Sequence, residues 1–219
     1  MSERTLANRI ASLYDSRSLQ GYVRWKVRFD PIYEGVLAPL RDLTTPILDL
    51  GCGVGILAFF LREHGIASPI LGIDFDERKI AEARKAAARS RDVTFEVGDA
   101  RAPLPDGYNV VVLDLLHYFD SASQQRILEN VARAVPIGGT VVIRQGLRDG
   151  SWRYRFTAIV DAIGRAIRWM RAEALNYPTR DEVMRAFADF DVAITPLWGG
   201  TPYNNYLFVL RRAADRRSE

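Results

Sequence analysis

The sequence predicts an α/β fold in which a mostly parallel sheet is covered by helices on both faces. Strand-like and helix-like patterns alternate from residue 46 to residue 144. The strand candidates are apolar throughout, as expected for strands buried on both faces of a parallel sheet. The last two strand candidates are joined by a short Pro/Gly-rich link at 196–202, which suits an antiparallel pair at the end of the sheet.

The predicted elements follow from apolar periodicity. Five strands are expected at 46–50, 69–74, 93–97, 109–113 and 140–144, and two more at 192–195 and 206–210. Helical patterns fall at 54–63, 77–90 and 123–134. Seven strands with intervening helices fit one domain, and 219 residues are enough to bury a full core.

Two segments outside this alternation predict a helical lid. The first is 1–42, where apolar residues recur at helical spacing; its members are Leu6, Ile10, Leu13, Tyr14, Tyr22, Trp25 and Phe29. The second is 146–178, an amphipathic helix with an apolar side (Trp152, Phe156, Ile159, Val160, Ile163, Ile167, Met170) and a basic side (Arg153, Arg165, Arg168, Arg171). Aromatic residues of both segments can enclose an apolar or aromatic ligand, and some of them must instead pack the lid onto the core: Tyr14, Tyr22, Trp25, Tyr33, Trp152, Tyr154 and Trp169.

These patterns divide one domain, 1–219, into four parts. They are an N-terminal helical cap at 1–42, a core at 43–145, the lid insertion at 146–178 and the C-terminal part of the sheet at 179–211. The Arg-rich end, 211–219, is expected to fray.

Composition excludes several classes of protein. Apolar residues make up 48% and charged residues 26% of the chain, which is ordinary for a globular protein. We expect no membrane span and a cytoplasmic location, because no apolar run approaches about 20 residues and the N-terminus lacks an apolar signal core. One cysteine and two histidines argue against a metal site of the Cys/His type.

The basic balance is weak evidence for a nucleic-acid partner. The net charge is +3 and the pI about 9.1, but lysine occurs only at Lys26, Lys79 and Lys85, and the arginines are spread along the chain. We therefore do not expect nucleic acid as a partner.

The most informative segment runs from Ile47 to Leu57. A short apolar run carries Asp49 and leads into Gly51, Cys52, Gly53 and Gly55. A dinucleotide fingerprint would have its third glycine at the position of Ile56, one place later. The pattern instead resembles the first motif of class I S-adenosylmethionine-dependent methyltransferases, acid-x-Gly-x-Gly-x-Gly.

The resemblance covers residues 45 to 145 well and the last 40 residues loosely. It implies a doubly wound, seven-stranded, mostly parallel sheet with an antiparallel last strand, and S-adenosylmethionine as the cofactor. It is closest to small bacterial methyltransferases that act on small molecules.

The loop and the following strand ends supply cofactor candidates. The three glycines and Cys52 would bring main chain close to the ligand. Asp74 ends the second strand 23 residues after Gly51, where an acid can accept both ribose hydroxyls. It can also cap the helix that opens at Glu77, although Asp76 is available for that role. Phe75 would then lie where an adenine can stack.

Three further acids complete the predicted cofactor set. Asp49 either faces the ligand's ammonium group or only caps the turn. By the resemblance, Asp99 accepts the adenine amino group and the Ala100 N–H meets a ring nitrogen, although Gly-Asp is also common turn chemistry. Asp114 ends the fourth strand, beside the expected position of the transferable methyl group.

Acceptor candidates follow the fourth and fifth strands. The run Leu115 to Phe119 lacks the Asn/Asp-Pro-Pro-aromatic pattern of methyltransferases that modify nucleic-acid bases, and looks more like the Leu-His-aromatic run of small-molecule enzymes. His117 is the candidate general base, or else a packed residue. Arg144 can clamp a carboxylate, a phosphate or a thioester-bound chain, or belong to a solvated basic face. The predicted acceptor contacts are Arg144, Tyr22, Trp25, Tyr118 and Trp152.

The leading prediction is methyl transfer from S-adenosylmethionine to a small, partly apolar or aromatic acceptor. Lipid, polyketide or aryl-polyene biosynthesis is a suitable setting, and an acyl carrier protein is one candidate partner. The chain is expected to be a monomer or a homodimer. Two alternatives stay open: a nicotinamide-dependent oxidoreductase, and a non-catalytic subunit that binds the cofactor as a scaffold.

Overall fold

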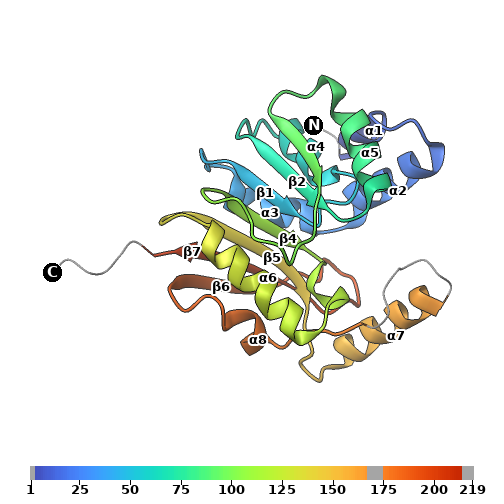
Figure 1. Ribbon diagram of the computed structural model, residues 1–219. Coiled ribbons are helices and arrows are strands. Elements are labelled where there is room, and N and C mark those ends of the chain that lie inside the picture. The colour runs from blue at the N-terminus through green and yellow to red at the C-terminus, as the bar shows by residue number, and fades with distance from the viewer. Residues whose placement is uncertain (1–2, 167–174, 214–219) are drawn as a thin grey trace. The chain divides into compact units, whose positions relative to one another are not determined.

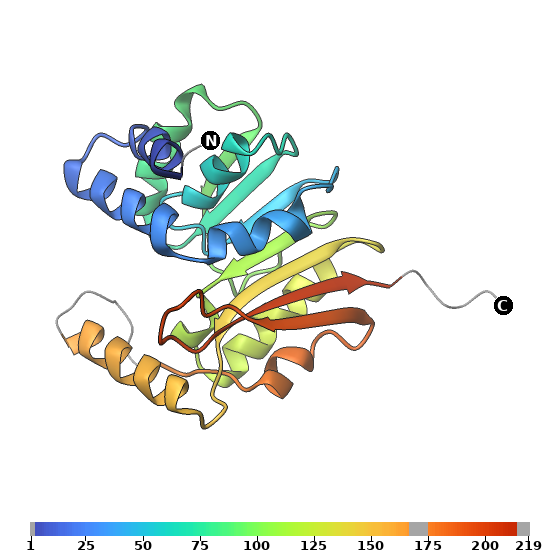
Figure 2. The same ribbon diagram turned by 180° about the vertical axis from the view of Figure 1, so that it is seen from behind.

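The computed structural model describes residues 3–166 and 175–213, drawn in Figures 1 and 2. The chain divides into two compact units, Met1–Ala100 and Arg101–Glu219. The seven strands have the order β3-β2-β1-β4-β5-β7-β6, and the pairings within each unit are parallel except those made by β7. The predicted α/β class, with a mostly parallel sheet and an antiparallel last strand, is confirmed.

The first unit holds three parallel strands with helices before and between them. In chain order its elements are α1 (Glu3–Ala11), α2 (Arg17–Phe29), α3 (Ile32–Leu40), β1 (Ile47–Leu50), α4 (Ile56–Glu63), β2 (Ile70–Asp74), α5 (Glu77–Ala86), a short 3₁₀ turn (Ala87–Arg89) and β3 (Val93–Val97). β2 pairs with β1 on one side and with β3 on the other.

The core of the first unit forms where the sequence is continuously apolar. All of β1 is buried, and so are the first six residues of α4, Ile56–Leu61. Aromatic rings join the N-terminal helices to α4: Tyr33 lies 5.1 Å from Phe60, and Tyr14 meets Phe59 edge-on at 6.0 Å. The N-terminal segment is therefore packed onto the first unit by its own aromatic residues.

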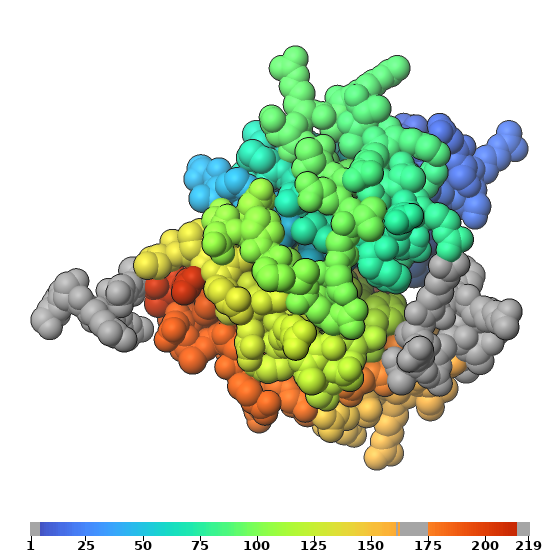
Figure 3. Space-filling view, viewed as in Figure 1, coloured from blue at the N-terminus to red at the C-terminus, as the bar shows by residue number. Residues whose placement is uncertain are grey.

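The second unit holds the other four strands. Its elements are β4 (Asn109–Leu113), a 3₁₀ turn η2 (Leu116–Tyr118), α6 (Ser121–Ala134), β5 (Thr140–Gly146), α7 (Trp152–Ala166), α8 (Arg180–Met184), β6 (Phe190–Pro196) and β7 (Asn205–Arg212). β4 and β5 are parallel, whereas β7 runs antiparallel to both β5 and β6. Helix α6 covers one face of the strands of this unit: Figure 1 draws the strands behind it, and its yellow-green atoms cover them in Figure 3.

Helix α7 confirms the predicted helical insertion but turns its apolar side outward. Trp152 and Ile159 are 63% and 61% exposed, whereas Thr157 is buried. Thr157 accepts a hydrogen bond from the Asn204 amide, and the Arg153 guanidinium stacks on the Trp198 ring at 4.2 Å. Contacts to the β6–β7 connection therefore hold the side of this helix that carries Arg153 and Thr157, whereas Trp152 and Ile159 are exposed. The predicted helix positions Ile167, Arg168, Trp169, Met170 and Arg171 lie outside the described residues.

None of the helices that the structure describes combines the length and the apolar character needed to cross a bilayer. The predicted boundaries of the cap, core, lid and C-terminal parts stay predictions.

Candidate functional site

The glycine loop is a tight turn tied to the neighbouring strand. Gly51, Gly53 and Gly55 have φ angles of 83°, 57° and 83°, in the left-handed region that favours glycine. The amides of Gly51 and Cys52 donate to the Ile73 carbonyl at 2.7 and 3.1 Å, which fixes the turn against β2. The Cys52 side chain is buried, so it supports the loop from inside.

The second and third glycines have different roles. A Cβ at Gly55 would lie 2.4 Å from Phe95 Cζ, whereas a Cβ at Gly53 would meet nothing within 4 Å. Gly55 is thus required for packing as well as for its φ angle. Gly53 keeps main chain open to approach, as a loop that binds a ligand requires.

Asp74 connects the glycine loop with the start of α5. Its carboxylate is buried and accepts hydrogen bonds from the amides of Gly53 and Asp76, each at 2.9 Å. Asp76 caps α5 by accepting from the Arg78 amide at 3.0 Å, the role that sequence reasoning reserved for it. A carboxylate has about four acceptor positions, so Asp74 retains about two for ribose hydroxyls.

Asp49 is a second buried acid at the same strand ends. It is 3% exposed, and burial, followed by repulsion from Asp74, raises the pKa of Asp49 to about 7. None of the described lysine, arginine or histidine side chains forms an ion pair with it. Two neighbouring buried carboxylates make a site that favours a cation, which fits the ammonium and sulfonium groups of S-adenosylmethionine.

The predicted adenine residues lie on the neighbouring turns of this unit. Phe75 is 64% exposed and follows Asp74 directly. The Gly98 amide donates to the Asp74 carbonyl at 3.1 Å, which brings the turn after β3 next to Asp74. Asp99 on this turn is exposed and Ala100 is buried. Their contacts with an adenine stay predictions.

Tyr14 supports the glycine loop, a role that sequence reasoning missed. Its hydroxyl donates to the Val54 carbonyl at 2.9 Å, and burial raises the pKa of Tyr14 well above its usual value. Tyr33 is also buried, with its pKa raised for the same reason. Of the two roles predicted for the lid aromatics, Tyr14 and Tyr33 have the packing role, because both lie buried in the core. The helical spacing from Ile10 to Tyr14 was the available signal.

The other predicted aromatic contacts are exposed. Tyr22 and Trp25 on α2 are 42% and 56% exposed, and Tyr118 in η2 is 41% exposed. Their role as acceptor contacts stays a prediction, as does that of Trp152 on α7.

In the second unit, His117 is held in a cluster of rings. Its side chain is buried and stacks on Tyr177, with ring centroids 5.4 Å apart and planes 13° from parallel. Tyr118 packs against it at 4.2 Å, and the Gln145 side-chain amide lies 3.2 Å from His117 Nδ1. Sequence reasoning identified His117 but not Tyr177 or Gln145.

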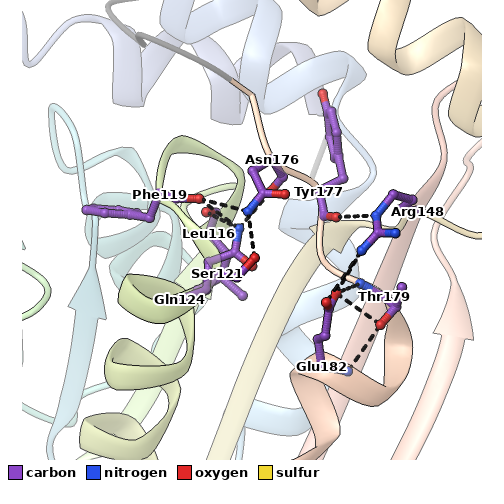
Figure 4. Close-up of polar contacts among 9 residues, drawn as sticks. All are labelled: Leu116, Phe119, Ser121, Gln124, Arg148, Asn176, Tyr177, Thr179 and Glu182. Carbon is purple, nitrogen blue, oxygen red and sulfur yellow. Dashed lines mark hydrogen bonds and ion pairs between the residues drawn. The ribbon is translucent and has the colours of Figure 1, made fainter.

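Figure 4 shows how the chain around Tyr177 is anchored from two sides. On one side, the Asn176 amide donates to the His117 carbonyl and the Gln124 side chain donates to the Asn176 carbonyl, at 2.9 and 2.6 Å. On the other side, the Arg148 side chain donates to the Tyr177 carbonyl at 3.2 Å and pairs with Glu182 at 3.3 Å. The Tyr177 ring is thereby fixed against His117.

Arg144 and Asp114 form an ion pair at the ends of β5 and β4. Arg144 Nε lies 3.2 Å from Asp114 Oδ1, and Arg144 is 7% exposed. Asp114 has a φ of 54°, unusual for a residue other than glycine, which places its side chain at a sharp turn after the strand. The predicted contacts of Arg144 with an acceptor and of Asp114 with the cofactor stay predictions. No set of described residues forms a metal-binding cluster.

Comparison with known proteins supports the glycine-loop assignment. Residues 47–139 match a family described as "Methyltransferase domain". A demethylmenaquinone methyltransferase of Thermus thermophilus is 36% identical over 123 residues, which are 55% of this chain and 53% of that protein. A ribosomal protein L11 methyltransferase of Burkholderia vietnamiensis is 43% identical over 72 residues, 32% of this chain and 23% of that protein. The chain thus spans only a quarter to a half of these relatives.

Solved structures agree with the fold over nearly the whole chain. A geranyl diphosphate methyltransferase in complex with S-adenosylmethionine aligns with a TM-score of 0.69 and 14% identity, covering 93% of this chain and 94% of that one. A magnesium protoporphyrin IX methyltransferase from Synechocystis with bound S-adenosylhomocysteine aligns with a TM-score of 0.63 and 15% identity, covering 95% and 94%. Residues 47–139 thus match a methyltransferase domain, and the chain shares the fold of solved methyltransferases that hold S-adenosylmethionine or S-adenosylhomocysteine.

Proposed function

We propose that this protein transfers the methyl group of S-adenosylmethionine to a small, partly apolar or aromatic acceptor. The observation that carries the proposal is the arrangement of Gly53, Asp49 and Asp74. Gly53 leaves main chain open to a ligand, and the two acids are buried beside it without a basic partner among the described residues.

The proposed cofactor contacts divide by chemistry. Gly51, Gly53 and Gly55 shape the loop, and Asp49 attracts the ammonium end. Asp74 accepts the ribose hydroxyls while its other lone pairs hold the amides of Gly53 and Asp76. The adenine lies against Phe75, Asp99 and Ala100. S-adenosylmethionine supplies an already activated methyl group, so the protein contributes mainly alignment, which can supply about 7–11 kcal/mol of the barrier.

The acceptor is proposed to contact exposed rings and one buried arginine. The rings are Tyr22, Trp25, Tyr118 and Trp152, and the arginine is Arg144. The names of the relatives support small molecules with apolar parts, since a demethylmenaquinone and a geranyl diphosphate methyltransferase are among them. Delivery by an acyl carrier protein in a lipid or polyketide pathway would use exposed arginines such as Arg148.

A panel of acceptors tests this proposal. Purified protein is incubated with S-adenosylmethionine and either a demethylmenaquinol, geranyl diphosphate or ribosomal protein L11, and S-adenosylhomocysteine release is measured. Release with a small apolar acceptor is the expected result. Methylation of the ribosomal protein alone would overturn the acceptor class.

Asp74→Asn in the same assay tests the site. This variant removes the charged acceptor, and we expect KM for S-adenosylmethionine to rise at least tenfold, about 1.4 kcal/mol. Asp92→Asn is the matched control, since Asp92 is an exposed acid in the loop before β3 and should leave KM unchanged. An unchanged KM in Asp74→Asn would remove Asp74 from the site.

A further inference from the structure

Gln145 lies at the centre of the His117 cluster, and its side-chain amide has a defined orientation. It is fully buried on β5. Its Oε1 accepts from the Leu116 amide at 3.2 Å, and its Nε2 donates to the Gly146 carbonyl at 3.2 Å. Rotating the amide by 180° would place oxygen against that carbonyl and NH₂ against the Leu116 N–H. The main chain therefore fixes which end of Gln145 faces the histidine.

The end that faces His117 is the donor. Gln145 Nε2 lies 3.2 Å from His117 Nδ1, and one of its two hydrogens is already directed to the Gly146 carbonyl. The second hydrogen meets a ring nitrogen that can accept it only when that nitrogen carries no proton. We infer that Gln145 is a positioning residue that holds His117 neutral, with its proton on Nε2.

The rings of Tyr118 and Tyr177 pack on His117, with centroids 4.2 and 5.4 Å away, and a phenol ring carries no formal charge. The charged neighbour of Gln145 on β5 is Arg144, which pairs with Asp114. A second proton on Nδ1 would set two N–H donors against each other, at the cost of one hydrogen bond and a repulsive contact.

This proton position changes the role that the sequence suggested for His117. With Nδ1 accepting from Gln145 and Nε2 protonated, the ring offers a hydrogen-bond donor and no lone pair with which to remove a proton. His117 is therefore not the general base; it donates from Nε2 to an oxygen of the acceptor. This part rests on the proposed function.

The acceptor class follows from the same geometry. Neutral amines and alkenes also need no base, but a donor from Nε2 stabilises a negative oxygen. The geometry therefore favours an acceptor that reacts in an ionised form, such as a phenolate, an enolate or a carboxylate. The acceptor forms a bond to the methyl carbon, and the carbon–sulfur bond breaks with its electron pair left on sulfur. No proton moves to His117 in this step.

The chain contains its own reference for the proton position. His64, the only other histidine, has Nδ1 2.9 Å from the Phe60 carbonyl. A carbonyl only accepts, so His64 must carry its proton on Nδ1. The two histidines are thus expected to be opposite tautomers in the same protein.

Nitrogen-15 NMR of the full chain labelled in histidine tests the inference. At pH 7.5 we expect His117 to show an unprotonated Nδ1 and a protonated Nε2, and His64 to show the reverse; His64→Gln assigns the signals. The wild-type spectrum decides the proton position without any variant of Gln145. A protonated Nδ1 on His117 would overturn the inference.

Gln145→Glu tests the cause of this proton position. A carboxylate only accepts, so Nδ1 of His117 should become protonated while the His64 signals stay in place. The matched control is Gln125→Glu, the same change on the outer side of α6, which should leave both histidines unchanged. Unchanged His117 signals in folded Gln145→Glu would remove Gln145 as the cause.

Turnover tests the acceptor class separately. Among hydroxylated aromatic acceptors, we expect turnover at a fixed pH to rise with the ionised fraction of the hydroxyl group. Turnover independent of that fraction would overturn the assigned acceptor class. If no acceptor is methylated at all, the proposed function fails while the proton position is still decided by NMR.

Discussion

Replacing Asp49 by Asn should remove a pH dependence from cofactor binding. The pKa of Asp49 is raised to about 7, first by burial and then by Asp74. If the ionised form binds the ligand's ammonium group, affinity scales with the ionised fraction, which is about 9% at pH 6 and about 76% at pH 7.5. Wild-type protein should therefore bind S-adenosylhomocysteine about eightfold more tightly at pH 7.5 than at pH 6.

Isothermal titration calorimetry at the two pH values measures this ratio. An ordinary α-amino group, with a pKa of about 7.7–8.0, is still only about 60–75% protonated at pH 7.5, so the measured ratio is corrected for the ligand's own titration before it is compared with eightfold. Asp49→Asn retains both histidines, so any pH dependence of S-adenosylhomocysteine affinity that remains in the variant comes from the histidines. Equal wild-type affinity at the two pH values, or a full eightfold ratio in Asp49→Asn, would show that the Asp49 carboxylate does not bind the ammonium group.

Four further changes test the packing around the loop and the His117 cluster. Asp49→Asn should also change the free energy of unfolding of the unliganded protein, and it should stabilise the protein more at pH 8 than at pH 4. The reason is that the raised folded-state pKa of Asp49 makes the wild type lose stability as pH rises from about 4 to about 7. Urea unfolding at both pH values measures this difference, and an equal effect at the two pH values would contradict it. Gly55→Ala should destabilise more than Gly53→Ala, because only the former meets Phe95, and equal urea midpoints would contradict this. Tyr14→Phe should cost about 1 kcal/mol of unfolding free energy through the lost bond to the Val54 carbonyl, and no change would mean that this bond is not formed. Thr179→Ala should cost about 1 kcal/mol by removing the capping box with Glu182, which thermal unfolding would detect and Ser at the same position should restore.

Much of the fold was predictable because the strand signals are local. β3 and β4 begin and end at the predicted residues, since each is a short apolar or alternating run bounded by turn residues. The glycine loop and the cap role of Asp76 were predictable for the same reason: spacing along the chain fixes them.

Other features depend on contacts between distant residues. The side of α7 that packs is the one whose Thr157 and Arg153 have partners in the β6–β7 connection, which no periodicity reveals. The proton position on His117 depends on Gln145, which lies 28 residues away in sequence and reads as an ordinary strand residue. Side-chain orientation, unlike strand position, is set by tertiary partners.

Calorimetric titration of the purified protein with S-adenosylhomocysteine, with NAD and NADP titrated in parallel, tests the cofactor site directly. We expect micromolar binding of S-adenosylhomocysteine and no heat from either nicotinamide cofactor. Binding of NAD or NADP instead would contradict the assignment of the Gly51–Gly53–Gly55 loop. Binding of none of the three by protein freed of carried-over ligand would contradict the proposed cofactor site itself.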